Sequence, residues 1–323
     1  MAEKPRIAII GLGRIGASMG LALKKANSDL EVIGHDKDSR TAQRAQKRGA
    51  VDKTEWNLLN ACDGAGLIVL ALPVGAIQDT LKFLSGELQP GVVVTDTAST
   101  KAPVLQWAST LLPGISFVGG DPIIPPTRAA DREADAFIDA GLFQDAVYCL
   151  TPSMQAAESA VRLVSTFVSL LGAKPLFIDA QEHDGLITGA EHLPYLLAAT
   201  LLHTTTTGSG WRDMSKLAGR DFQSATELAA RDPVQQRHLV LHHRQDLVRW
   251  IDLTINTLSE MREALEKEDA ARLDKLFGEM IDARTTWLKG QTGAAPAIDA
   301  TDLKPSLSRM LLGGLAPKRG KGK

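Results

Sequence analysis

The sequence has few cysteines, few aromatic residues, almost no net charge and no long hydrophobic run. Its 323 residues include only Cys62 and Cys149, too few for a disulfide framework or a thiolate-rich metal site, so we expect a reducing compartment. Aromatic residues make up 5% of the chain and are not interleaved with basic ones, which argues against a nucleic-acid-reading module. No apolar run approaches the roughly 20 residues that span a bilayer, and residues 1–10 lack a signal-peptide pattern. We therefore expect a cytoplasmic protein that binds neither nucleic acid nor a membrane.

The net charge of -2 hides a basic carboxyl-terminal segment. Residues 304–323 carry six Lys or Arg and no acid. Such a segment could contact nucleic acid or anionic lipid. The alternative, which we favour, is a disordered end that is punctuated by Gly and Pro. We therefore predict that residues 301–323 form a basic tail outside the folded domains.

Short apolar runs alternate with helical patterns through residues 1–179. This alternation predicts an α/β domain built on a doubly wound parallel sheet. The predicted strands cover residues 6–10, 30–34, 67–70, 92–95, 116–118, 147–150 and 175–178. The predicted helices cover residues 14–25, 39–48, 74–84, 102–109 and 155–171.

From residue 180 to about residue 300 the pattern is helical throughout. The predicted helices cover residues 182–205, 222–230, 234–267 and 269–289, and Pro233 suits the first turn of the third one. A helix over residues 234–267 would be roughly 50 Å long, too long for a small domain to cover alone. We therefore predict an all-helical domain that pairs with a second copy of the chain. A monomeric bundle folded back on itself is the alternative.

A glycine-rich loop follows the first predicted strand. Gly11, Gly13 and Gly16 form a Gly-x-Gly-x-x-Gly pattern between a strand and a helix, which is the setting of a Rossmann-type dinucleotide site. There the first glycine permits a tight turn, the second lets the backbone approach a pyrophosphate, and the third allows close packing of helix on strand. The predicted cofactor loop consists of Gly11, Leu12, Gly13, Arg14, Ile15 and Gly16.

The end of the second predicted strand indicates which dinucleotide binds. Asp36, 25 residues after Gly11, can accept hydrogen bonds from both ribose hydroxyls and would repel a 2′-phosphate, which favours NAD over NADP. Lys37 and Arg40 weaken that preference, because a basic residue here can hold the phosphate. FAD proteins share the glycine pattern, but we find none of their further segments. Leu72 and Pro73 follow the third predicted strand and are expected to flank the cofactor.

Several segments, in this order along roughly residues 5–290, together resemble one family, the prephenate and arogenate dehydrogenases of tyrosine biosynthesis. The segments are Gly11 to Gly16 with Gly34 to Asp36, Asp96 to Lys101, Phe117 to Pro122, Leu142 to Phe143 with Tyr148 to Pro152, His183 to Asp184 with His192 to Pro194, and Phe222 to Ala229 with Asp232 to Pro233. The resemblance implies a Rossmann domain, a helical dimerisation domain and an oxidoreductase. Its reaction would be the NAD-dependent oxidative decarboxylation of a cyclohexadienyl substrate. A base takes the ring hydroxyl proton, hydride leaves the same carbon, and loss of carbon dioxide makes the ring aromatic.

The resemblance also implies roles for individual residues. Ser99 matches the active-site serine that hydrogen-bonds the ring hydroxyl, although it could instead cap the helix that follows it. Lys101 would add positive charge beside the substrate, or could be a surface lysine. His183 and His192 match two site histidines, and we expect one of them to titrate near neutral pH.

Three positions depart from the family. Asp121 stands where the family has its catalytic histidine, and a carboxylate can replace that base only if burial raises its pKa from about 3.9. Tyr195 replaces a histidine and keeps a hydroxyl for hydrogen bonding. Glu227, after Thr226, replaces the arginine that binds a substrate carboxylate in the family. A basic residue nearby could supply the missing positive charge instead. The two acids, Asp121 and Glu227, suit an amino-bearing substrate such as arogenate or an amino-prephenate analogue better than prephenate.

The altered positions leave two other hypotheses open. One is a dehydrogenase or reductase of the same fold that acts on a different small molecule, and the other is an NAD-binding protein without catalysis. We predict no metal site, because the i, i+4 pair of His238 and His242, beside His243, has no acidic partner.

Overall fold

A computed structural model describes residues 4–27, 29–125 and 138–290 of the chain. The chain divides into two compact units, the first ending at Asp184 and the second beginning at Gly185. The boundary therefore lies inside helix α8 (Ala180–Ile187) and slightly beyond the predicted residue 179. The predicted tail, residues 301–323, lies outside the described residues.

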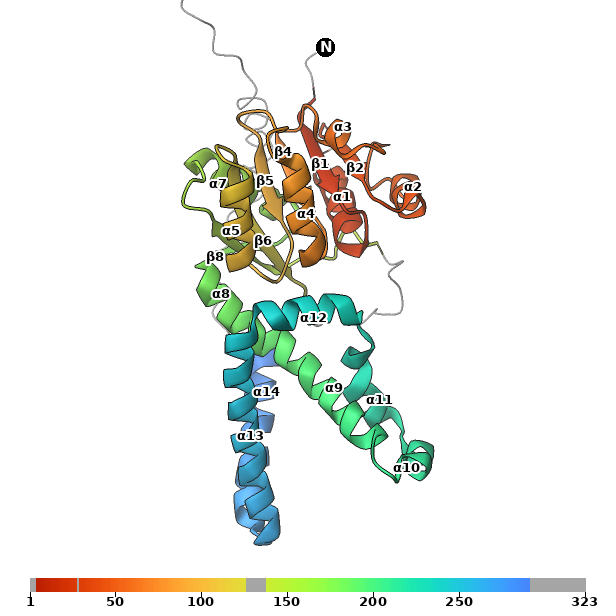
Figure 1. The fold of residues 1–323 in the computed structure, drawn as a ribbon, viewed down its shortest axis with the longest axis vertical. Coiled ribbons are helices and arrows are strands. Elements are labelled where there is room, and N and C mark those ends of the chain that lie inside the picture. Colours follow the sequence, from red (N-terminus) through yellow and green to blue (C-terminus); the bar gives the residue numbers. More distant parts are fainter. Residues whose placement is uncertain (1–3, 28, 126–137, 291–323) are drawn as a thin grey trace, which may run out of the picture. The chain divides into compact units, whose positions relative to one another are not determined.

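The first unit is built on an eight-stranded sheet with the order β3-β2-β1-β4-β5-β6-β7-β8 (Figure 1). The strands are β1 (Arg6–Ile10), β2 (Glu31–His35), β3 (Lys53–Thr54), β4 (Leu67–Leu70), β5 (Val93–Asp96), β6 (Ser116–Ile123), β7 (Val147–Pro152) and β8 (Lys174–Phe177). All seven predicted strands are present, and the two-residue β3 was not predicted. The prediction was a parallel sheet, and the structure departs from it at one pair of strands, because β7 runs antiparallel to β6.

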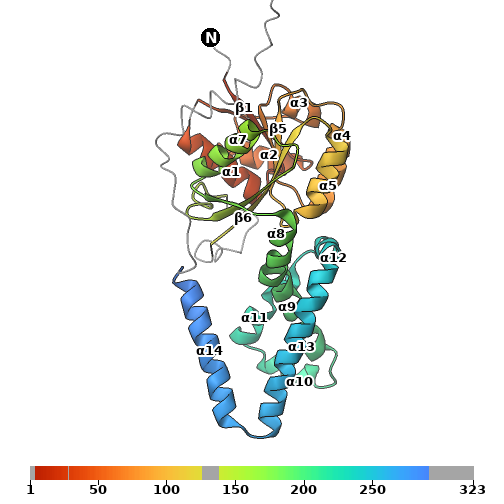
Figure 2. The same ribbon diagram turned by 90° about the vertical axis from the view of Figure 1, so that its left-hand side faces the viewer.

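Helices cover both faces of this sheet. They are α1 (Arg14–Ala26), α2 (Ser39–Lys47), α3 (Leu58–Cys62), α4 (Val74–Leu84), α5 (Ala102–Leu111) and α7 (Glu158–Leu170). Helices α1 and α7 lie on one face, while α4 and α5 lie on the other (Figure 2). The central strands are buried on both faces, as Ile7, Ile9 and Val69 are fully buried, and this explains their continuous apolar runs. The doubly wound α/β prediction is thus confirmed.

The register of the central strands places several loops at one edge of the sheet. Ile10 pairs with Leu70, and Leu70 with Asp96, so β1, β4 and β5 end at the same level. Thr95 pairs with Val118, and β6 then continues for five residues past this pairing. The carboxyl edge of a parallel sheet is where ligands bind in doubly wound folds, and the predicted cofactor loop and Asp121 both belong to it.

The second unit is helical, as predicted, but its helices are shorter. They are the end of α8, the π-helical turn η1 (Thr188–His192), α9 (Leu193–Thr206), α10 (Trp211–Leu217), α11 (Arg220–Thr226), the 3₁₀ helix η2 (Glu227–Ala230), α12 (Pro233–His242), α13 (Arg244–Glu266) and α14 (Ala270–Leu288). The predicted single helix over residues 234–267 is wrong. His243 leaves the helical conformation at φ -99° and ψ 19°, which separates α12 from α13.

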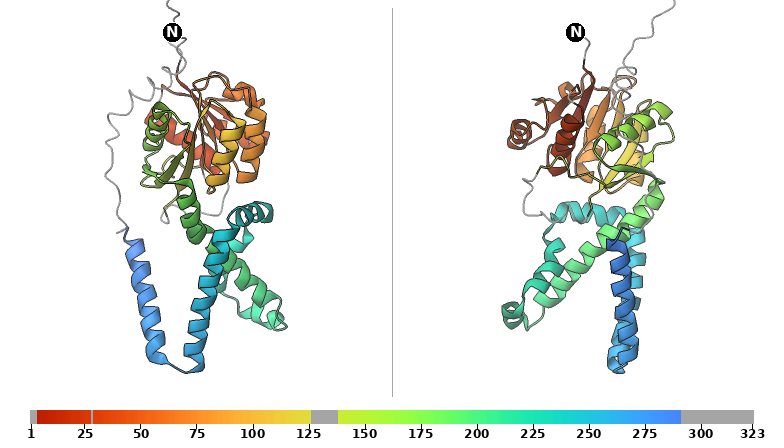
Figure 3. Two further views of the ribbon diagram at one scale, coloured as in Figure 1. Left: turned by 60° about the vertical axis from the view of Figure 1, so that its left-hand side comes forward. Right: turned by 180° about the vertical axis from the view of Figure 1, so that it is seen from behind.

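Helices α13 and α14 form a long hairpin with a tight turn at Glu268, whose φ is +52° (Figure 3). Both helices expose large apolar side chains, and none of the described residues of α14 is buried. The exposed apolar residues of the hairpin are Val248, Ile251, Leu253, Ile255, Leu258, Leu265, Phe277, Met280, Ile281, Trp287 and Leu288. Within the described residues, we find no helix with the length and apolar character that crossing a membrane requires.

Candidate active site

The glycine loop after β1 has the backbone geometry that only glycine allows. Gly11 has a φ of +94°, and its N–H donates to the carbonyl oxygen of His35 at 2.8 Å. A Cβ on Gly11 would overlap the carbonyl oxygen of Ala71, and a Cβ on Gly16 would overlap that of Gly11. The turn and the helix behind it therefore both depend on glycine.

Gly13 differs from its two neighbours because it faces open space. It is exposed, and a Cβ built on it would meet nothing within 4 Å. It is the N-cap of α1 and supplies no side-chain cap for the first N–H groups of that helix. The N–H groups at the start of a helix beside an open glycine form a cradle that suits the pyrophosphate of a dinucleotide.

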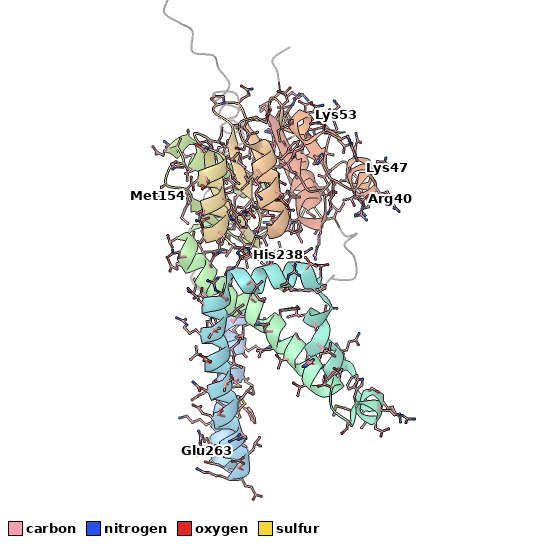
Figure 4. All side chains as sticks on the ribbon, in the orientation of Figure 1. Arg40, Lys47, Lys53, Met154, His238 and Glu263 are labelled. Carbon is pink, nitrogen blue, oxygen red and sulfur yellow. The ribbon has the colours of Figure 1, made fainter. Side chains whose placement is uncertain are left out.

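Asp36 joins this loop to the end of β2. Its Oδ2 accepts a hydrogen bond from the N–H of Leu12 at 2.8 Å, and its Oδ1 accepts one from the N–H of Asp38 at 2.9 Å. The carboxylate is therefore held at the carboxyl edge beside the cradle. Lys37 and Arg40 are exposed, and Arg40 points away from the protein (Figure 4).

The remaining predicted cofactor residues lie at the same edge. Arg14 and Ile15 begin α1, where both are partly buried, and Leu12 is fully buried. Leu72 is partly buried after β4, while Pro73 is exposed as the N-cap of α4. Their role as the walls of a cofactor site stays a prediction.

Asp121 and His183 form a buried pair in the first unit. The Nε2 of His183 lies 3.1 Å from Oδ2 of Asp121, and their side chains are 3% and 7% exposed. The other ring nitrogen of His183, Nδ1, lies 3.0 Å from Oδ1 of Asp184. The imidazole is therefore held between two carboxylates from β6 and α8. Two residues that the sequence nominated separately are in direct contact.

Asp184 also caps the helix that follows the Ser99 loop. Its Oδ1 accepts from the N–H of Lys101 at 2.7 Å, and its Oδ2 accepts from the N–H of Ala102 at 2.9 Å. The alternative in which Ser99 caps this helix is wrong, because the N-cap residue of α5 is Lys101. Ser99 is partly buried in the loop after β5, which leaves its predicted role as a substrate contact open.

Lys101 is placed differently from the prediction. Its side chain is completely buried, and Nζ donates to Oδ2 of Asp96 and to the carbonyl oxygen of Gly120, both at 2.6 Å. An ammonium group with no exposed surface and two internal acceptors does not offer a contact to substrate. No role was predicted for Asp96, although it opens one of the segments that resemble the family.

The charged groups of this site shift each other's pKa values. Burial raises the pKa of Asp121, and the hydrogen bond from His183 and the charge of Lys101 oppose that rise. Burial disfavours the charged form of His183, but hydrogen bonds to Asp121, Asp184 and Cys149 outweigh it and raise the pKa of His183 to about 11. His183 is therefore a cation at neutral pH and donates from both ring nitrogens. Of the two histidines expected to supply a group that titrates near neutral pH, His183 is therefore not that group.

A buried tyrosine lies against the same strand. Tyr148 pairs with Pro122 across β6 and β7, and its hydroxyl has no hydrogen-bond partner among the described residues. Burial and the charges of Asp96 and Asp121 raise the pKa of Tyr148, so the phenol is neutral. Neither Tyr148 nor its neighbour Cys149, which pairs with Asp121, was predicted as a site residue.

The other predicted substrate residues belong to the second unit. His192 is 2% exposed, and its ring centroid lies 4.6 Å from that of His243. Tyr195 lies partly buried on α9, which packs against η2, the helix that begins at Glu227. Glu227 is exposed, and the Thr226 hydroxyl donates to the carbonyl oxygen of Phe222 at 2.7 Å. The second unit thus brings the helices of Tyr195 and Glu227 together.

Comparison with known proteins gives matches along most of the chain. The model of the prephenate dehydrogenase nucleotide-binding domain matches residues 19–176, and that of the prephenate dehydrogenase dimerization domain matches residues 179–279. Prephenate dehydrogenase of Bacillus subtilis is 30% identical over 300 residues, covering 91% of this chain and 79% of that protein. Cyclohexadienyl dehydrogenase of Zymomonas mobilis is 28% identical over 283 residues, covering 86% of this chain and 94% of that protein.

Solved structures show the same fold. Prephenate dehydrogenase from Aquifex aeolicus, in complex with hydroxyphenyl propionate and NAD+, has a TM-score of 0.79 at 23% identity, covering 88% of this chain and 98% of that one. Arogenate dehydrogenase from Synechocystis has a TM-score of 0.71 at 24% identity, covering 87% of this chain and 99% of that one.

A glycine-rich dinucleotide cradle, a buried acid–imidazole pair at the same sheet edge and a helical second unit define the class of this protein, a dinucleotide-dependent dehydrogenase. The chain belongs to the prephenate dehydrogenase family. Its first unit is the nucleotide-binding domain of that family, and its second is the dimerization domain.

Proposed function

We propose that this protein catalyses the NAD-dependent oxidative decarboxylation of a cyclohexadienyl substrate, arogenate or prephenate, in tyrosine biosynthesis. Family membership supports the reaction class, and relatives named prephenate and cyclohexadienyl dehydrogenase support the substrate class. The observation that carries the proposal is the buried pair of Asp121 and His183 at the carboxyl edge of the sheet. This edge also holds the dinucleotide cradle.

In the proposed reaction, Asp121 is the general base. Its carboxylate accepts the ring hydroxyl proton, and burial favours this transfer because it raises the pKa of the carboxyl group. When bound, the nicotinamide supplies the hydride acceptor. His183 stays protonated and holds Oδ2 of Asp121, which leaves Oδ1 to meet the substrate. Ser99 adds a hydroxyl at the same edge and is proposed to orient the ring hydroxyl.

The proposed cofactor is NAD, held by Gly13 at the pyrophosphate and by Asp36 at the ribose. Asp36 is fixed by the N–H groups of Leu12 and Asp38, so a 2′-phosphate would meet a carboxylate that cannot easily turn away. Lys37 and Arg40 are exposed and make the selection against NADP incomplete.

The glycine loop gives a matched pair of variants. Gly13→Ala should fold normally, because its Cβ meets nothing within 4 Å, and should weaken NAD binding about tenfold, roughly 1.4 kcal/mol. Gly11→Ala should instead lower the thermal stability, because its φ of +94° and the Ala71 carbonyl both exclude a Cβ. Calorimetric titration with NAD and thermal unfolding separate the two effects. NAD affinity equal to wild type in a folded Gly13→Ala would show that this loop does not hold the pyrophosphate.

The proposed substrate preference rests on Glu227, which stands where the family resemblance places an arginine. A carboxylate there suits the ammonium group of arogenate and repels prephenate, which has the same two carboxylates but a keto group in place of the ammonium. Glu227→Arg should therefore shift the ratio of kcat/KM values towards prephenate by about tenfold or more, equal to roughly 1.4 kcal/mol.

A single assay tests both the function and the preference. NADH production is measured with arogenate and with prephenate for the wild type, Glu227→Arg and the exposed control Glu87→Arg in the first unit. The function would be refuted if the wild type bound NAD but oxidised neither acid. The preference would be refuted if the wild type used prephenate better than arogenate.

We also propose that the second unit pairs two copies of this chain. The match to a dimerization domain and the apolar side chains exposed along α13 and α14 support this assembly. Burial of such side chains is worth about 25 cal/mol per Å², so the hairpin would gain from a partner. A monomeric mass in analytical ultracentrifugation at micromolar concentration would contradict it.

A further inference from the structure

The proposed reaction makes no use of the buried ion pair between Lys101 and Asp96. The two side chains are 0% exposed, and Nζ lies 2.6 Å from Oδ2. Replacing such a pair with packed apolar residues is often neutral or stabilising, so a buried pair is weak evidence for a role in stability. Its position in the site suggests another role.

The pair grips the backbone immediately before Asp121. Oδ1 of Asp96 accepts from the N–H of Gly120 at 3.0 Å, and Nζ of Lys101 donates to the carbonyl oxygen of Gly120 at 2.6 Å. Both peptide groups that flank Gly120 are therefore held by charged side chains. Gly120 is also closely packed, because a Cβ there would lie 2.7 Å from the Asp96 carbonyl oxygen and from Tyr148.

The same lysine is tied to the side chain of Asp121 by a second route. Its backbone N–H donates to Asp184, which contacts Nδ1 of His183 at 3.0 Å. The Nε2 of His183 contacts Asp121 at 3.1 Å. The contacts thus form a closed ring that holds Asp121 by its main chain and by its carboxylate. Four segments of the first unit contribute to this ring.

We propose that Lys101 and Asp96 are positioning residues that hold the Asp121 carboxylate in its working place through the backbone of Gly120. The proposal rests on the proposed function for the role of Asp121 as base. It gives Lys101 an internal role in place of the substrate contact that the sequence suggested. Neither residue of the pair touches substrate in this proposal.

The charges around Asp121 make the proposal testable, because they predict the direction in which its pKa shifts when each charge is removed. Within the first unit, Asp121 is surrounded by the cations His183 and Lys101 and the anion Asp96, with Asp184 behind the imidazole and neutral Tyr148 on β7. Lys101 lowers the pKa of Asp121, whereas Asp96 raises it. Removing the lysine charge should therefore raise this pKa, and removing the Asp96 charge should lower it.

The test is a titration of the Asp121 carboxyl group in the full chain, followed by ¹³C NMR of labelled aspartate and assigned by the signal missing in Asp121→Asn. Lys101→Met should raise the titration midpoint on the order of one pH unit, and Asp96→Asn should lower it by a similar amount. Lys101→Arg keeps the charge and should leave the midpoint near that of the wild type. Circular dichroism checks that each variant is folded.

If the pair served only the stability of the fold, Lys101→Met and Asp96→Asn would disturb the Asp121 carboxyl group in the same way. Titration midpoints of Asp121 that move in the same direction in both variants, or that do not move, would therefore overturn the proposal. If Lys101→Met does not fold, Lys101→Gln, which also removes the charge but keeps a hydrogen-bond donor, takes its place and should raise the midpoint in the same way. Where turnover is measured, kcat should fall at least tenfold in Asp96→Asn with little change in KM. A wild type that oxidises neither cyclohexadienyl acid would refute the proposed function, while the titration would still decide the role of the pair.

Discussion

Asp121→Asn should lower kcat by about 10²–10⁴-fold, the usual contribution of a general base. The amide has nearly the shape of the carboxylate and can still accept the hydrogen bond from Nε2 of His183, whose charge keeps the carboxylate of Asp184 as a partner, so the fold should persist. It cannot take up the ring hydroxyl proton, however. NAD binding should also persist, because Asp121 lies on β6 and the dinucleotide cradle follows β1.

The pH profile separates this loss from a general disturbance. In the wild type, kcat/KM should fall as the pH drops through the raised pKa of Asp121, because the protonated carboxyl group cannot accept a proton. His183, with a pKa of about 11, should add no second ionisation near neutral pH. In Asp121→Asn, kcat/KM should be low at every pH and should no longer fall as the pH drops through this range. The exposed control Asp79→Asn, on α4, should keep both the wild-type rate and this fall. A decrease of less than threefold in Asp121→Asn would place the base elsewhere, with Ser99 and His192 the next candidates.

The sheet could be predicted from the sequence because its buried strands are continuous apolar runs. The bounds of β1 and β4 match the prediction to the residue. β3 was missed because two residues carry no periodic pattern. The break at His243 was missed because no glycine or proline marks it in the sequence. His243 is a buried residue packed on His192, and this contact depends on the tertiary fold.

The site could be predicted as a set of residues but not as a network. Asp121 and His183 are 62 positions apart, and the cap that Asp184 places on Lys101 spans 83 positions. No local pattern encodes such contacts. The resemblance implied that Lys101 adds positive charge beside the substrate, and its full burial was not expected because lysine is seldom fully buried. Its partner Asp96 is five residues away, a spacing that does not by itself indicate burial.

His183→Gln should destabilise the protein by roughly 3–5 kcal/mol at neutral pH, because removing one partner of a buried ion pair leaves the other charge uncompensated. Asp121 and Asp184 would both lose the imidazolium between them. The pKa of His183 is raised from 6.5 to about 11 in the folded chain, so the folded state holds a proton that the unfolded state releases between these values. The stabilisation from this proton is therefore full below pH 6.5 and is lost as the pH rises towards 11.

The difference in unfolding free energy between the wild type and His183→Gln should accordingly shrink as the pH is raised from 6.5 towards 11. Urea denaturation at several pH values in this range measures it, with the exposed His203→Gln on α9 as the control. A difference that stays constant with pH would mean that His183 is neutral in the folded protein. Asp121 would then lack its cationic partner, and the base would have to work beside a neutral imidazole, with Lys101 as its remaining buried cation in the first unit.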